Sequence, residues 1–282
     1  MIKEHVGYSI VIANYNSGRF LEDAILSVIK QNYPKVQLII IDGGSIDNSV
    51  DIIKRYEQYI DFWVSEKDSG QSEAFNKGFI QAKYDWLFWL NADDFLLENS
   101  LRSLDSEMCK KLNDDATCQW FTFDNVVVNE DGMTNRVLYG PAWNDFFCRR
   151  LGPQIHSATS VFHKSLFECS LRFDTKLYWS MDLDLWYQFF NLGKKYQIIH
   201  RFIYGFRIND QSKTISNGVS SSIERSEERW RQTGYMYKKN KMHIRREWIK
   251  WWRLYKAFTI YPQNIYYTLL YRGKQWKWWS KY

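Results

Sequence analysis

The stretch Asp85–Glu98, DWLFWLNADDFLLE, decides the fold. It begins with a short continuous apolar run, Trp86–Leu90, which is typical of a strand buried on both faces in the middle of a sheet. The run ends abruptly in Asn91-Ala92-Asp93-Asp94 before apolar residues return. Adjacent carboxylates in this place are costly to desolvate unless a cation meets them, and ligands of open α/β sheets bind at this edge. The stretch therefore indicates either a metal or ligand site or simple capping of the next segment.

Three alternations of strand and helix precede this stretch. We predict strands at Tyr8–Ala13, Val36–Ile41 and Phe62–Ser65, and helices at Phe20–Ile29, Ser49–Tyr59 and Ser72–Ala82. Such alternation with short connections predicts an α/β protein with a Rossmann-like, right-handed, mostly parallel sheet flanked by helices. Parallel order would bring the acids that follow the strands, Asp42, Glu66, Asp68, Asp93 and Asp94, to one edge. Neither a GxGxxG nor a P-loop motif is present, which disfavours those nucleotide sites.

The second half of the chain continues with mixed elements. We predict a helix at Leu101–Leu112, a hairpin of strands at Cys118–Val128 and Thr134–Leu138, a further strand at Tyr196–Phe206, and charged helices over 220–240 and 243–258. The four cysteines are widely spaced without a CxxC pair, which argues against a zinc site and a disulfide scaffold. Neither a signal peptide nor an apolar run of about 18 residues is recognisable, so we expect a protein of the reducing cytoplasm.

Charge is distributed unevenly along the 282 residues. Residues 220–282 hold 15 Lys and Arg against 4 Asp and Glu, a net of +11, whereas residues 1–219 hold 23 against 28, a net of −5. Seven of the 14 tryptophans also lie in the last segment. The chain is therefore an acidic body followed by a basic, aromatic tail.

Four segments in this order and spacing carry a family resemblance: SIVIANYN (9–16), IIIDGGSIDNS (39–49), SEKDSGQSEAFNKGF (65–79) and WLNADD (89–94). Together they resemble the nucleotide-sugar half of the family 2 inverting glycosyltransferases of bacterial polysaccharide type, which have the GT-A fold. The resemblance implies a GT-A domain over 1–219, with a nucleotide-sugar half (about 1–98) and an acceptor half (99–219). Residues 220–282 would form a helical extension.

The resemblance also implies a donor site. The carboxylate after the second strand, Asp42, would bind the nucleobase, although Gly43 stands where relatives often have a second acid. The Asp-x-Asp element would hold Mg²⁺ or Mn²⁺ through Asp93 and Asp94, with Asn91 at its first position; oxygen ligands suit these hard cations. The remaining residues implied to contact the nucleotide sugar are Ala13, Tyr15, Asp68, Gln71, Asn76, Asp93 and Arg207. Helix capping and surface polarity are the alternative for Asp68, Gln71 and Asn76.

The acceptor half resembles the family over Gly152–Leu185. An acidic element there opens a helix, and Met181-Asp182 matches it, so Asp182 would be the general base. The alternative is that Asp182 only caps the helix and favours its dipole; Asp184, two residues on, should face elsewhere. His156 is a candidate for the acceptor pocket. In the loop that begins at Arg207, Asn209 occupies the position at which the family commonly carries a metal-binding or diphosphate-binding His.

The tail has its own pattern. Segment 243–258 places Trp and Tyr at helical spacing among Arg and Lys, which suits the headgroup layer of a membrane. The alternatives are packing against the body, an oligomer contact such as a homo-oligomer, and, least favoured, nucleic acid.

The resemblance, together with the basic tail, implies a metal-assisted inverting glycosyltransferase that takes a nucleoside-diphosphate sugar, with a UDP-sugar as the favoured donor, and a glycan or lipid-linked oligosaccharide acceptor in surface polysaccharide synthesis. It would be peripheral on the inner face of the cell membrane through 243–282. A non-catalytic sugar-nucleotide-binding or scaffold protein, favoured by Met181 and Asn209, and a nucleotidyltransferase are the alternatives.

Overall fold

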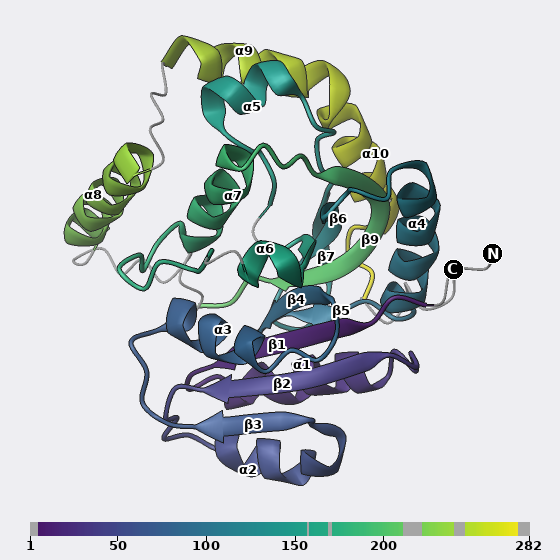
Figure 1. The fold of residues 1–282 in the computed structure, drawn as a ribbon, viewed down its shortest axis with the longest axis vertical. Coiled ribbons are helices and arrows are strands. Elements are labelled where there is room, and N and C mark those ends of the chain that lie inside the picture. Colours follow the sequence, from purple (N-terminus) through teal and green to yellow (C-terminus); the bar gives the residue numbers. More distant parts are fainter. Residues whose placement is uncertain (1–4, 157, 169–170, 211–221, 240–245, 276–282) are drawn as a thin grey trace.

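The computed structural model describes residues 5–156, 158–168, 171–210, 222–239 and 246–275, and the strands of this part of the chain form one curled sheet (Figure 1). The strands are β1 (Tyr8–Asn14), β2 (Val36–Asp42), β3 (Phe62–Ser65), β4 (Trp86–Asn91), β5 (Phe95–Leu96), β6 (Trp120–Val128), β7 (Thr134–Leu138), β8 (Ser160–His163) and β9 (Gln197–Arg207). Their order is β3-β2-β1-β4-β8-β6-β9-β5, with β7 paired to β6. The predicted α/β class is confirmed.

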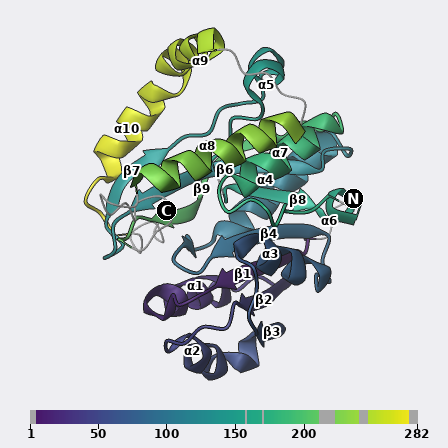
Figure 2. The same cartoon turned by 90° about the vertical axis from the view of Figure 1, so that its left-hand side faces the viewer.

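The first half of the sheet is parallel from β3 to β4. Its connections are the helices α1 (Gly18–Ile29), α2 (Ser49–Arg55) and α3 (Gln71–Ile80). Helices α1 and α2 lie on one face of the sheet and α3 lies on the other (Figure 2). The helix predicted over Ser49–Tyr59 ends earlier, at Arg55, and a 3-10 turn, η1 (Glu57–Tyr59), completes the connection.

The second half of the sheet is mixed. Strand β8 lies antiparallel between β4 and β6, and β6 pairs antiparallel with β7 and parallel with β9. The predicted hairpin of β6 and β7 is confirmed. The helices of this half are α4 (Ser100–Asp114), α5 (Asp145–Leu151), α6 (Lys164–Glu168) and α7 (Met181–Asn191). Neither β5 nor α5 was predicted, because a two-residue strand and a seven-residue helix are too short to show periodicity.

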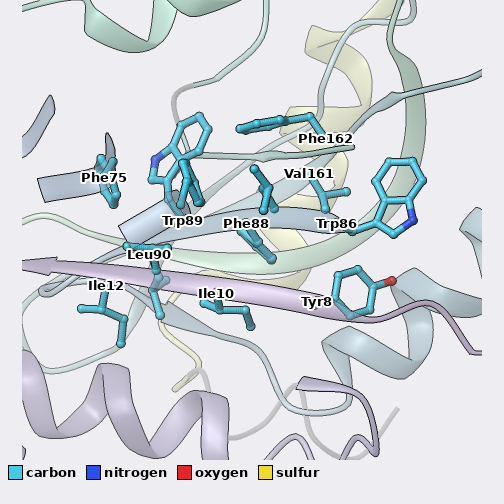
Figure 3. Packing of buried hydrophobic residues seen from close by; sticks show 14 of the residues in the cluster. Tyr8, Ile10, Ile12, Phe75, Trp86, Phe88, Trp89, Leu90, Val161 and Phe162 are labelled. Atoms are coloured by element: carbon cyan, nitrogen blue, oxygen red, sulfur yellow. The ribbon is translucent and has the colours of Figure 1, made fainter. Parts of the chain in front are cut away.

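Aromatic side chains fill the layer between β4 and the helices that cover it. Figure 3 shows Trp89 of β4 among Phe75 of α3 and Phe162 of β8. On its far side the Trp89 ring stacks on Trp186 of α7, and Trp186 stacks in turn on Trp120 of β6, each pair with centroids 5.2 Å apart. Buried aromatic rings contribute strongly to stability through their large apolar area. Helix α7 is thereby fixed to the sheet by its second turn.

The C-terminal extension forms α8 (Ser222–Lys239), α9 (Arg246–Thr259) and α10 (Tyr261–Tyr271). Helix α10 was not predicted. It covers β7, where Asn264 Oδ1 accepts a hydrogen bond from the Tyr139 backbone N at 2.6 Å and Thr268 Oγ1 accepts one from the Val137 N at 3.2 Å. Helix α9 packs its Trp252 on Phe147 of α5, with centroids 5.0 Å apart. Packing against the body, one of the alternatives for the tail, is therefore observed.

Candidate functional site

The carboxyl ends of three parallel strands lie level with one another. Asn14 at the end of β1 pairs with Asp42 at the end of β2, and Ala13 pairs with Asn91 at the end of β4. Tyr15, immediately after β1, is 64% exposed. The predicted convergence of these strand ends is therefore present, and we call this edge the donor rim, defined by Ala13, Tyr15 and the side chains of the loops after β2, β3 and β4.

Asp42 lies beneath the donor rim and is fully buried. Its two oxygens accept four hydrogen bonds: from Asn14 Nδ2 at 2.6 Å, from the Ser45 N at 2.9 Å, and from the hydroxyls of Ser45 and Ser65 at 2.5 Å each. Four donors use the acceptor sites of a carboxylate. Binding of a nucleobase by Asp42, which the family resemblance implies, stays a prediction; in this structure the carboxylate fixes the β2 loop to its neighbours.

Asp68 approaches the place of the missing second acid. A Cβ on Gly43 would lie 3.1 Å from both Asp68 carboxylate oxygens, so a side chain at position 43 would press on this group. Asp68 is half-buried, and Oδ1 accepts a hydrogen bond from the Gly70 N at 2.8 Å. Burial, with the neighbouring charges of Glu73 and Asp42, raises the pKa of the Asp68 carboxyl. Among the described residues Oδ2 has no hydrogen-bond partner, which leaves it for a ligand.

A hydrogen-bonded chain crosses the donor rim from α3 to β9. Gln71 Nε2 donates to Asn91 Oδ1 at 2.7 Å, and Asn91 Nδ2 donates to Asp94 Oδ2 at 2.7 Å. Asp94 also accepts hydrogen bonds from the Tyr204 hydroxyl at 2.5 Å and from the Arg207 N at 2.8 Å. Only 1% of Asp94 is exposed, and burial raises its pKa well above the ordinary value. The role of Asp94 as a metal ligand stays a prediction; in this structure the carboxyl is enclosed and ties β9 to the β4 loop.

Asp93 is the acid of this pair that reaches the surface. It is half-buried, and its Oδ2 accepts a hydrogen bond from Asn209 Nδ2 at 2.9 Å. Among the described residues no group of three His, Cys, Asp or Glu side chains is arranged to hold a metal ion. Mg²⁺ and its relatives are commonly held by one or two carboxylates together with substrate phosphates. Asp93 with the amide oxygen of Asn209 fits that minimal set, so these residues suit an ion that arrives with a nucleotide.

The Arg207 guanidinium points away from the donor rim. The residue is 3% exposed, its Nη2 pairs with Asp23 at 2.8 Å, and its guanidinium carbon lies 4.6 Å from the centre of the Phe20 ring. Both partners belong to α1. The diphosphate contact of Arg207 stays a prediction; in this structure the side chain joins β9 to α1.

The Asn76 amide is also used inside the chain. Its Nδ2 donates to the Phe173 carbonyl at 2.8 Å, and its Oδ1 accepts from the Phe173 N at 3.0 Å. This pair of bonds holds the segment before α7 against α3. The contact of Asn76 with the nucleotide sugar stays a prediction, and in this structure its amide supports the segment before α7.

The first turns of α3 and α7 meet beside the donor rim. Ser72 of α3 donates a hydrogen bond to Met181 Sδ at 3.1 Å, next to Gln71, which reaches Asn91. Asp182 follows Met181 in the first turn of α7 and is half-buried, with no hydrogen bond or ion pair among the described residues. The helix N-terminus favours negative charge there. The Gln71–Asn91 and Ser72–Met181 hydrogen bonds therefore connect the turn that carries Asp182 to the end of β4 through α3.

Asp184 faces elsewhere, as expected. It is fully buried and accepts hydrogen bonds from Gln188 Nε2 at 2.7 Å and from Lys239 Nζ at 2.9 Å. Lys239 also pairs with Asp174 at 2.9 Å. Since Lys239 ends α8, these ion pairs join the extension to α7 and to the segment before it.

His156 lies apart from the donor rim, in the wall of a cavity between the body and the extension. Burial, with the nearby charges of Lys256 and Arg136, lowers the pKa of its imidazole to about 4. Its place in an acceptor pocket stays a prediction.

Sequence reasoning missed the residues that organise the site from within. Asn14 supports Asp42, Tyr204 supports Asp94, and Ser72 contacts the α7 turn. Asn14 lies within the SIVIANYN motif, whereas a single Tyr in a strand and a single Ser at a helix start give no signal.

The family model for glycosyl transferase family 2 matches residues 9–171, which is more than half of the chain. The chain belongs to this family. Among curated relatives, an uncharacterized glycosyltransferase of Rickettsia typhi is 26% identical over 239 residues, 84% of this chain and 73% of the relative. The poly-beta-1,6-N-acetyl-D-glucosamine synthase of Staphylococcus epidermidis is 37% identical over 89 residues, 31% of this chain and 22% of that protein.

Solved structures confirm the predicted GT-A fold. Staphylococcus aureus TarS residues 1–349 in complex with UDP-GlcNAc gives a TM-score of 0.59 at 14% identity, covering 76% of this chain and 62% of that chain. The mannosyltransferase PcManGT of Pyrobaculum calidifontis in complex with GDP-Man and Mn²⁺ gives a TM-score of 0.57 at 14% identity, covering 84% of this chain and 72% of that chain. At such identity the likeness establishes the fold. The chain spans less than two thirds of the length of the TarS structure.

Proposed function

We propose that this protein transfers a sugar from a nucleoside-diphosphate sugar to an acceptor hydroxyl with inversion, and that Asp182 is the general base. The observation that carries the proposal is the junction of α3 and α7: Gln71 reaches the end of β4, Ser72 reaches Met181, and Asp182 follows with its carboxylate unpaired among the described residues. A base of this kind must be within reach of both acceptor and donor, and a helix that is fixed to the sheet provides that position.

The donor is held at the rim by side chains that remain accessible. The exposed Tyr15 ring suits stacking on a nucleobase, and the half-buried Asp68 offers a carboxylate oxygen to a ribose or base. Gln71 and Asp93 lie where the β4 loop would meet the diphosphate. Asp42, Asp94 and Arg207 support these positions from below.

The reaction is a single displacement at the anomeric carbon. The acceptor oxygen forms a bond to that carbon while the bond to the diphosphate oxygen breaks, and the bonding electrons leave with the nucleoside diphosphate. Asp182 takes the proton of the attacking hydroxyl. Attack on the face opposite the leaving group inverts the anomeric configuration.

A divalent cation, when bound by Asp93 and the Asn209 amide oxygen, would offset the negative charge of the departing diphosphate. Mg²⁺ and Mn²⁺ both suit oxygen ligands. The PcManGT structure with GDP-Man and Mn²⁺ is consistent with such an ion in a protein of this fold.

The extension supports a role at a membrane surface. Trp251, Phe258 and Leu269 of α9 and α10 are 57%, 77% and 75% exposed, and Lys250 and Arg253 stand exposed near them. Aromatic and apolar side chains among cations suit the headgroup layer, where each basic residue contributes about 1 kcal/mol. Within the described residues no helix has the length and apolar character to cross a bilayer. We therefore propose peripheral attachment to the inner face of the cell membrane and a surface polysaccharide as product.

Two measurements test the proposal. Thermal shift with UDP-sugars and GDP-sugars in the presence of Mn²⁺ should identify a donor, because bound ligand stabilises the folded state by mass action. Incubation of that donor should then release nucleoside diphosphate slowly, and faster with acceptor. Release of pyrophosphate would instead indicate a nucleotidyltransferase, and binding without turnover would indicate a scaffold.

A further inference from the structure

A cavity of about 530 Å³ lies between the C-terminal extension and the body. Its walls come from the end of β7 and the residues after it, the end of α5, the segment before β8, the first turn of α7, and the C-terminal extension. They include His156, Leu183, Tyr237, Trp252, Lys256 and Ile260. A cavity of this size is in the range that small-molecule sites occupy.

The cavity has one end next to the candidate base. Leu183, which lines it, follows Asp182 directly in the first turn of α7. The other walls belong to α9 and α10, whose outer surfaces carry the exposed Trp251 and Phe258. The cavity therefore lies between the proposed membrane-facing helices and the proposed site of transfer.

The walls combine apolar surface with a single cation. Among the described residues that line the cavity, Lys256 is the one Lys or Arg, and none is an Asp or Glu. Its Nζ lies 5.7 Å from the centre of the Trp252 ring and 5.6 Å from that of Tyr261, which holds the ammonium over two aromatic faces. Within the described part of the chain no carboxylate pairs with Lys256.

The neutral polar groups of the wall add hydrogen bonding without negative charge. His156 stays uncharged at neutral pH because burial lowers its pKa to about 4. Asn264 contributes the nitrogen of its side-chain amide, whereas the Gln154 amide nitrogen donates to the Leu151 and Gly152 carbonyls. An ammonium without a carboxylate partner, beside neutral donors and a mostly aliphatic and aromatic wall, attracts an anion joined to an apolar group.

We propose that this cavity binds the phosphate-bearing end of an aliphatic lipid phosphate, with the phosphate at Lys256 and the first part of the chain along Leu138, Ile249 and Ile260. The proposal rests on the proposed function, since it names the acceptor as a sugar carried on a lipid phosphate. Such an acceptor would enter from the membrane side and present its sugar hydroxyl toward α7.

The test is isothermal titration calorimetry of the full chain with farnesyl phosphate, farnesol and inorganic phosphate, each below its aggregation concentration. Farnesyl phosphate should bind saturably, and each fragment should bind at least tenfold more weakly. Lys256→Met should weaken farnesyl phosphate binding at least tenfold, Lys256→Arg should retain it, and the matched control Lys250→Met, exposed on the same helix, should leave it unchanged.

Several results would overturn the proposal. They are absence of farnesyl phosphate binding, equal binding of inorganic phosphate, and equal loss in the Lys250→Met and Lys256→Met proteins. Thermal shift with the nucleotide-sugar donor is run on the same samples. A donor response without farnesyl phosphate binding rejects the cavity assignment alone, whereas farnesyl phosphate binding without any donor response rejects the proposed glycosyl transfer.

Discussion

Asn209 donates a hydrogen bond from its side-chain nitrogen to Asp93 Oδ2 over 2.9 Å, so the loop after β9 closes on the loop after β4. The Asn209 amide stands at the position where the family resemblance implies an imidazole. An amide oxygen is a weaker ligand for Mn²⁺ than a neutral imidazole nitrogen. Asn209 thus occupies the position of a second protein ligand beside Asp93, but its amide would bind a metal ion only weakly.

Replacing Asn209 by His should therefore strengthen metal binding. We expect the Kd for Mn²⁺ in the presence of nucleoside diphosphate to fall about tenfold, which corresponds to about 1.4 kcal/mol. Electron paramagnetic resonance of free Mn²⁺ measures this directly. Asp93→Asn in the same assay should weaken binding, and an unchanged Kd in both variants would show that the ion is held elsewhere.

Gly43 keeps space for the Asp68 carboxylate. A methyl group at position 43 would lie 3.1 Å from both Asp68 oxygens and would displace them by a few tenths of an ångström. We expect Gly43→Ala to reduce donor affinity about tenfold, or about 1.4 kcal/mol, while the melting temperature changes little, because Asp68 is half-buried and can move. Titration calorimetry with the identified donor tests this, with Gly234→Ala, exposed on α8 with open space around it, as a control for folding. Equal donor affinity in wild type and Gly43→Ala would remove Asp68 from the donor site.

Lys239 stabilises the junction of α8 with α7 by pairing with the buried Asp184 and with Asp174, each at 2.9 Å. Lys239→Met removes the cationic partner of the buried Asp184, and removal of one partner from a buried ion pair is destabilising. Because the Lys239 side chain is 33% exposed, solvent reduces the effect, and we expect a loss of about 1–2 kcal/mol in the free energy of unfolding.

Denaturant unfolding of the double variant Lys239→Met/Asp184→Asn supplies the control. Removing the buried charge should recover part of the stability that Lys239→Met alone loses. Lys238→Met, at an exposed neighbouring position, should behave as wild type. If Lys238→Met and Lys239→Met lose the same amount, the ion pairs do not hold α8 in place.

His156 should make stability depend on pH in mildly acidic solution. Its pKa falls from 6.5 to about 4 in the folded protein, so the neutral imidazole is favoured by folding. The corresponding stability is fully present above pH 6.5 and is lost as the pH falls from 6.5 toward 4, since the unfolded chain takes up the proton first. The full shift is equivalent to about 3 kcal/mol at most. In His156→Gln, the free energy of unfolding should change less with pH between 6.5 and 4, as measured by denaturant unfolding at several pH values. The same pH dependence in wild type and variant would contradict a buried neutral His156.

The elements that the sequence predicted well are those with a long apolar run or a clear alternation. Strand β4 has the apolar run, and the three units before it show the alternation of strand and helix. Their parallel order was enough to predict that Asp42, Asp68 and Asp93 lie at one edge. Short elements such as β5 and α5 have no periodicity to detect. The antiparallel insertion of β8 between β4 and β6 depends on contacts between distant segments, which a local pattern does not contain.

The side chains at this edge could be located but not assigned a role. Asp93 and Asp94 are neighbours in sequence, yet one reaches the surface and the other is enclosed by Asn91, Tyr204 and the Arg207 backbone. Which acid is enclosed depends on how β9 packs. The sequence likewise does not indicate that Arg207 is buried against α1, where Asp23 and Phe20 are its partners.

The most direct test of the account compares wild type with Asp182→Asn for donor binding and for transfer. Donor affinity is measured by titration calorimetry with Mn²⁺, and transfer by release of nucleoside diphosphate in the presence of acceptor. We predict nearly unchanged affinity and a loss of turnover of at least a hundredfold, as expected when a general base is removed. Unchanged turnover, or an equal loss of affinity and turnover, would contradict the central claim that Asp182 takes the acceptor proton.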